Sequence, residues 1–123
     1  MSTIKVDNLQ TTGGAGLYPA KSWVNFNGTG TVAILADGNV SSLTDRGTGV
    51  YTAILTTSTS TSNQTVSGSA VGAAGVSYNA SGVGRDSTVT KSTSNFGIYV
   101  AKNNGSSAGP EFDSPDASVV VMA

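Results

Sequence analysis

The hydrophobic pattern of this chain consists of short stretches of β-branched and aromatic residues, which Gly, Asn and Asp separate. No window keeps an apolar stripe at the spacing of about 3.6 residues that a helix requires. Ser, Thr, Gly and Asn are abundant between the stretches, and these residues either pack poorly in a helix or compete with its hydrogen bonds. The pattern predicts an all-β fold, a small antiparallel β-sandwich or barrel-like domain with an N-terminal strand arm.

The first half of the chain contains a series of predicted strands. They cover residues 3–9, 21–27, 31–36, 40–43 and 50–56. Asp45-Arg46-Gly47 reads as a turn. The run Val32-Ala33-Ile34-Leu35 is continuously apolar and predicts a strand buried on both faces, whereas alternation within residues 50–56 places Tyr51 and Leu55 on one apolar face.

The second half contains five further predicted strands, of which the first two are weak because they are rich in Gly and Ala. They are predicted at residues 64–74, 76–80, 88–92, 96–102 and 117–122. Residues 58–63 contain only Ser, Thr and Asn, and they predict an exposed loop. Residues 103–115 form the longest predicted loop.

The N-terminal segment differs from the rest of the chain. Ile4 and Val6 alternate with polar residues and give the first predicted strand one apolar face. Gly13, Gly14 and Gly16 then interrupt it. We therefore expect residues 1–16 to form an arm that lets the first strand pack on a neighbouring chain, and residues 17–123 to form a single β-sandwich domain.

The charge balance excludes several classes of function. Six basic and seven acidic residues give a net charge of -1, which is not the basic footprint of a nucleic-acid-binding protein. The sequence contains no run long and apolar enough to span a membrane, and no secretory signal. We expect a protein made in a cytoplasm that binds no nucleic acid and does not insert into a membrane.

Candidate chemistry is limited by the absence of Cys and His. Thiolate and imidazole metal sites, thiol nucleophiles and the commonest general base are all excluded. Gly28-Thr29-Gly30-Thr31-Val32-Ala33 fits the dinucleotide fingerprint, but a strand rather than a helix is predicted after it. The six residues therefore predict a hairpin turn, and we expect no cofactor.

Carboxylates gather at one place in the sequence. Glu111, Asp113 and Asp116 lie in the loop between Pro110 and Pro115 or directly after it. They are either a solvated acidic loop or a weak Ca²⁺ site built from oxygen ligands. Glycoside hydrolysis needs two carboxyl groups across a cleft, which one loop does not supply. We expect no enzymatic activity and no resident metal.

Three aromatic residues raise the possibility of sugar binding. Trp23, Tyr78 and Tyr99 could stack on a sugar ring. In the sequence Trp23-Val24-Asn25-Phe26, however, a single Trp is more often an anchor of the core or of an interface.

Two stretches resemble a known group of proteins. Residues 1–10, MSTIKVDNLQ, followed by a Gly-rich break, resemble the opening of short virion proteins of marine and cyanobacterial phages. The second stretch runs KSWVNFNGTGTVAI, then NVSSLTD, then GTGVYT, within residues 21–52. It resembles a block found in phage tail-fibre and related appendage proteins. Arg46 and Val50 depart from the usual residues of that block, and the similarity fades after Thr56.

The resemblance implies a structural protein of the virion. It would be a component of a tail fibre or tail tip, or a fibre or decoration protein of the capsid, with other virion proteins as partners. It also implies a homotrimer, with Ile4, Val6, Trp23 and Phe26 at the subunit contacts. The alternative is a lectin-like module that binds a carbohydrate of the host surface.

Overall fold

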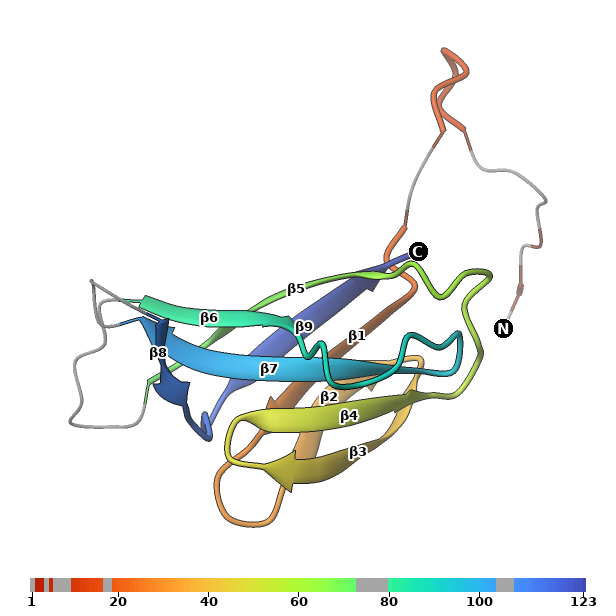
Figure 1. Cartoon of the computed structure of the whole chain (residues 1–123). Coiled ribbons are helices and arrows are strands. Elements are labelled where there is room, and N and C mark those ends of the chain that lie inside the picture. Colours follow the sequence, from red (N-terminus) through yellow and green to blue (C-terminus); the bar gives the residue numbers. More distant parts are fainter. Residues whose placement is uncertain (1, 4, 6–9, 17–18, 73–79, 104–107) are drawn as a thin grey trace.

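The computed structural model describes residues 2–3, 5, 10–16, 19–72, 80–103 and 108–123. This part of the chain contains nine strands and no helix, which confirms the all-β prediction (Figure 1). The strands are β1 (Ser22–Asn27), β2 (Ala33–Gly38), β3 (Val40–Gly47), β4 (Val50–Leu55), β5 (Thr65–Ala70), β6 (Ala80–Arg85), β7 (Asn95–Asn103), β8 (Ala108–Glu111) and β9 (Ala117–Met122).

All the strands belong to one antiparallel sheet. Its order is β2-β1-β9-β5-β6-β7-β4-β3, and β8 pairs with β7 beside this path. The sheet curls into a nearly closed, barrel-like shape (Figure 1). Within the described residues no ladder joins β2 to β3, so these two strands are the two ends of this strand order.

Alternating side chains of β1, β4, β7 and β9 make up most of the core. Val24 and Phe26 of β1 point inward, as do Tyr51 and Ala53 of β4. The rings of Phe26 and Tyr51 meet edge to face, with centroids 4.9 Å apart. β7 and β9 add Phe96, Ile98, Val100, Ala117, Val119 and Val121, and the buried cluster also includes Val40, Leu55 and Phe112. The predicted face of residues 50–56 is thus confirmed.

The chain turns from β2 into β3 at Asn39, the one residue between these strands. Asn39 has a backbone φ of 63°, a value that few residues other than Gly, Asn and Asp adopt. Its Nδ2 donates to the carbonyl oxygens of Lys21 (3.0 Å) and Thr57 (2.9 Å), and its Oδ1 accepts from the Thr57 amide (2.7 Å). The corner therefore ties the starts of β1 and β3 to the end of β4.

Two sequence predictions about the first half of the chain are wrong. Residues 31–36 are not buried on both faces, because β2 is an edge strand. Leu35 is 57% exposed, and it lies where the pairing of β2 with β1 is irregular, opposite Asn25 and Phe26. Asp45-Arg46-Gly47 is not a turn either, because β3 continues through Gly47 and the chain reverses only before Val50.

Three predictions about the second half also need correction. Residues 88–92 form no strand, and β8 lies within the predicted loop at residues 103–115. Thr59, in the predicted exposed loop, is only 8% exposed, because its hydroxyl donates to Thr61 and accepts from the Gln64 amide group. Most of the strand predicted at residues 76–80 lies outside the described residues.

Residues 10–16 lie away from the barrel (Figure 1). Gln10 and Gly16 pair across a tight turn in which residues 10–15 are exposed. The amide of Lys21 then bonds to the carbonyl of Val121 and joins the sheet. Most of the strand predicted at residues 3–9 lies outside the described residues. In the described part of the chain, no helix has the length and apolar character needed to cross a membrane.

Candidate functional site

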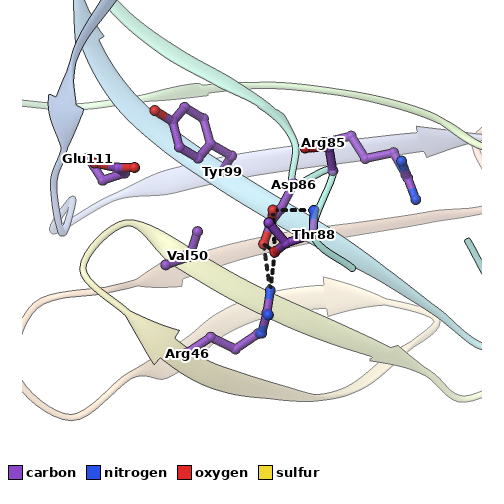
Figure 2. Close-up of a pocket in the computed structure, with 8 residues that line it drawn as sticks. Arg46, Val50, Arg85, Asp86, Thr88, Tyr99 and Glu111 are labelled. Carbon is purple, nitrogen blue, oxygen red and sulfur yellow. Dashed lines mark hydrogen bonds and ion pairs between the residues drawn. The ribbon is translucent and has the colours of Figure 1, made fainter. Parts of the chain in front are cut away.

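A polar pocket of about 490 Å³ opens where the β3–β4 turn, the chain after β6 and the end of β8 meet (Figure 2). It contains side chains of both charges. Its lining consists of Arg46, Val50, Arg85, Asp86, Ser87, Thr88, Tyr99 and Glu111. Tyr99, one of the predicted sugar-stacking aromatics, is half-buried here.

Asp86 is the most constrained group in this pocket. Its Oδ2 accepts from Arg46 Nη1 at 2.6 Å, and its Oδ1 accepts from the Thr88 amide and hydroxyl, both at 2.8 Å. Burial of Asp86 favours the neutral acid, but the bonds from Thr88 and the nearby Arg46 guanidinium outweigh it and hold the pKa of Asp86 below its usual value. The carboxylate is therefore ionised and fully engaged at neutral pH.

The chemistry open to the pocket follows from these bonds. Arg85 is also engaged, since its Nη2 donates to the carbonyl of Val89. Glu111 is exposed, and its carboxylate makes no hydrogen bond to the described residues. One free carboxylate does not provide the acid and base pair of a glycosidase. The Asp86 cluster instead holds the chain after β6 against β3.

The three acidic residues predicted as one cluster are separated by the fold. Asp113 accepts from the Gly49 amide (2.8 Å) and the Tyr51 hydroxyl (2.7 Å), whereas Asp116 accepts from Asn25 Nδ2 on another part of the sheet. Glu111 faces the polar pocket. Among the described residues, no group of three or more metal-ligating side chains is assembled.

The Asp113 bond also changes the chemistry of Tyr51. Burial, followed by the hydrogen bond to Asp113 and the charge of that carboxylate, raises the pKa of Tyr51 far above its usual value of 10.0. Next to it, a Cβ on Gly28 would lie 2.9 Å from Tyr51 Cζ. Gly28 lies in the predicted hairpin, which connects β1 to β2. The Tyr51 ring occupies the space that a side chain at position 28 would need.

The predicted interface residues occupy different environments. Phe26 has no exposed surface and packs inside its own chain, whereas Trp23, three residues earlier, is 44% exposed. Alternation along β1 explains this, because Trp23 and Asn25 face outward while Val24 and Phe26 face inward. Ile4 and Val6 lie outside the described residues, as does Tyr78.

The outward face around Trp23 is a second candidate site, a shallow groove of about 400 Å³. It crosses β1, β9 and β5. Trp23, Val120 and Ser67 form one row across the strands, and Asn25, Ser118 and Ser69 form the next. The sequence analysis did not single out the polar members of this groove. The alternation in Ser22–Asn27 was the available signal for Asn25, but the strands that carry the serines pair with β1 only in the folded chain.

The comparisons with known proteins add no assignment to this geometry. No family model, no curated protein and no solved structure matches the chain. The function is therefore argued from the fold, the two candidate sites and the resemblance described above.

Proposed function

We propose that this chain is a structural subunit of a phage virion that associates with copies of itself by β-strand packing. It would serve in a tail fibre or tail tip, or as a fibre or decoration protein of the capsid. The resemblance of residues 21–52 to phage appendage proteins supports this role, and so does the all-β fold. The observation that carries the proposal is the pair of open edges, β2 and β3.

Open sheet edges are templates for pairing with another chain. β2 and β3 are six and eight residues long, and neither contains Lys or Pro. Their charged side chains are Asp37 on β2 and Asp45 and Arg46 on β3, and Arg46 is paired with Asp86. β2 also exposes the side chain of Leu35. Strand addition from a neighbouring subunit would satisfy the edge backbone groups and cover this side chain.

The arm provides a segment that could reach a neighbour. Its described residues 10–15 are exposed and make no contact with the barrel in the arrangement seen (Figure 1). Three glycines, Gly13, Gly14 and Gly16, give the backbone freedom to redirect the segment before it. Exchange of arms between identical subunits is a low-cost route to an oligomer. The resemblance implies that the oligomer is a trimer.

Light scattering coupled to size-exclusion chromatography tests this proposal. We expect the full chain to have about three times the mass of one 12.2 kDa subunit at micromolar concentration. Leu35→Lys at the β2 edge, and the double variant Ile4→Asp/Val6→Asp in the arm, should each reduce the mass. Val71→Lys, at an exposed position directly after β5 in the interior of the strand order, is the matched control and should not.

Two further measurements complete the test. Circular dichroism should show that every variant keeps its β signal, which separates loss of assembly from unfolding. Antibody labelling of intact phage particles should locate the protein on the tail or the head. A full chain that remains monomeric, or particles that contain none of it, would contradict the proposal.

A further inference from the structure

The groove on the outer face of β1, β9 and β5 contains an exposed indole in an otherwise polar surface. Trp23 is 44% exposed, and Val120, its partner in the ladder, is 37% exposed. The other outward side chains here belong to Asn25, Ser118, Ser67 and Ser69. Trp23 adds little to the core of its own chain in this position, so its packing there does not explain why a large aromatic side chain lies on this face.

The indole ring has a defined position on the sheet. Trp23 pairs with Gly38 of β2, and a Cβ on Gly38 would lie 2.8 Å from Cδ1 and 2.9 Å from Cε2 of the indole. The ring therefore leans over the glycine and occupies the space that any other side chain would fill. One side of the ring packs on β2, and the exposed remainder borders the groove. Such a preorganised aromatic surface loses little entropy when a ligand packs on it.

The polar groups of the groove are also oriented. Asn25 Nδ2 donates to Asp116 Oδ1 (2.5 Å) and to Ser118 Oγ (2.9 Å), which fixes the amide plane. Asn25 Oδ1 accepts no hydrogen bond from the described residues, so it is available as an acceptor. The hydroxyls of Ser67 and Ser69 likewise make no bond within the described part of the chain. The groove thus offers hydrogen-bonding groups within two residues of the indole along each strand.

This combination selects one chemical class of ligand. A pyranose ring has an apolar face of C–H groups that packs on an aromatic ring, and a rim of hydroxyls that bonds to amides, hydroxyls and carboxylates. None of the residues that line the groove is charged, which disfavours a strongly ionic ligand. Trp23 and Val120 are the exposed large apolar groups among the lining residues, since Val24 and Val119 are buried, and they are fewer than the core of a protein interface usually presents.

We propose that this groove binds a neutral carbohydrate, with a pyranose ring packed against Trp23 and its hydroxyls bonded to Asn25 Oδ1 and the serines. The site lies within one chain, so it does not depend on the assembly proposed above. It gives the subunit a direct contact with a glycan surface.

The experiment uses the full chain and an array of neutral glycans, followed by titration with the glycans that bind. Trp23 is the only Trp in the chain, so its fluorescence reports on this groove alone. Binding should change the intensity or wavelength of its emission. Trp23→Ala, measured by calorimetry, should weaken binding about tenfold or more, and Trp23→Phe should weaken it less.

Control variants separate binding from folding and from assembly. Val71→Ala removes an apolar group that is 56% exposed and does not line the groove, so it should bind like the native chain. Gly38→Ala should displace the indole and weaken binding while the β signal remains. A monomer that binds glycan keeps this inference even if the proposed assembly fails.

Three results would overturn the inference. The first is an array without binding and a titration without any change in Trp23 emission. The second is glycan binding that is equally strong for the native chain and for Trp23→Ala. The third is a Trp23→Ala variant with a smaller oligomer mass and unchanged glycan binding, which would make the groove a subunit contact.

Discussion

At the scale of single residues, Asn39 shows how one side chain sets the path of the chain. It combines a positive φ with hydrogen bonds to Lys21 and Thr57. We expect Asn39→Ala to lower the free energy of unfolding by about 2–4 kcal/mol, because it loses these bonds and keeps an unfavourable φ. Urea unfolding measures this change.

Asn39→Gly is the matched control for the backbone term. Glycine adopts a positive φ without steric cost but makes none of the side-chain bonds. It should therefore be destabilised less than Asn39→Ala, and the difference measures the conformational strain. Equal stability of the native chain and both variants would show that the corner does not depend on Asn39.

Tyr51 gives the second prediction at this scale, which concerns alkaline pH. Burial and the Asp113 carboxylate raise the pKa of the Tyr51 phenol in the folded chain above its usual value of 10.0. The folded chain therefore holds this proton at a pH at which the unfolded chain loses it. The resulting stability is fully present below about pH 10 and is lost as the pH rises above it.

Chemical unfolding at pH 8 and at about pH 11 tests this dependence. The native chain should lose stability between the two, and Tyr51→Phe should lose less because the titrating group is gone. Tyr51→Phe should also be less stable than the native chain at pH 8 by about 1–2 kcal/mol, since the bond to Asp113 is lost. Tyr99→Phe is the control and should keep the full alkaline loss.

At the scale of strands, glycines differ in whether the sheet requires them. A Cβ on Gly68 of β5 would meet the Ser118 carbonyl and lie 3.1 Å from Val119 Cα, so β5 and β9 approach too closely for a side chain. Gly84 of β6 has no such neighbour within 4 Å. We expect Gly68→Ala to cost about 1–3 kcal/mol and Gly84→Ala to be neutral or stabilising by up to about 1 kcal/mol.

Thermal unfolding of the two alanine variants measures the contrast. Each change adds the same methyl group to a strand, so the effect of Gly→Ala on the unfolded chain is similar in both variants. The difference in stability between them then measures the steric contact at Gly68. A Gly68→Ala variant as stable as Gly84→Ala would mean that β5 moves away from β9 without cost.

The sequence predicts some strands better than others for a physical reason. Ser22–Asn27, Val50–Leu55 and Ala117–Met122 alternate clearly because one face packs on the core and the other faces outward. The apolar run in Ala33–Gly38 predicts burial on both faces, but this strand lies at a sheet edge. Its position at the edge depends on strand partners that are distant in sequence. Residues 88–92 have strand-forming composition, but the bonds of Asp86 to Thr88 favour a turn.

The candidate sites show the same limit. Glu111, Asp113 and Asp116 are close in sequence, but the fold gives each carboxylate a different environment. Trp23 and Ser67 are far apart in sequence, and β9 brings them to one face. Proximity in sequence thus suggested a site that does not form, and the groove arises from long-range pairing.

At the scale of the whole molecule, the Arg46–Asp86 ion pair joins distant parts of the sheet. Arg46 lies on β3 at one edge, and Asp86 follows β6, with β4 and β7 between these strands in the sheet order. The pair therefore holds the curvature of the sheet on this side. Since the net charge of the chain is only -1, no large general repulsion obscures the contribution of one such pair.

This arrangement predicts how stability changes in acid. Bonds from Thr88 and Arg46 lower the pKa of Asp86 in the folded chain despite its burial, so the unfolded chain takes up the proton at a higher pH than the folded chain. The resulting stability is present above the usual Asp value of 3.8 and is lost as the pH falls through the lower, folded value. Asp86→Asn should lower the free energy of unfolding by about 1.5–3 kcal/mol at pH 7, because charge-assisted hydrogen bonds are lost, and it should reduce the loss of stability in acid.

Unfolding curves from about pH 7 to pH 2 measure both effects. Asp37→Asn, on the exposed edge strand β2, is the control and should keep the acid loss of the native chain. An Asp86→Asn variant with native stability and a native acid loss would show that the ion pair does not hold the sheet.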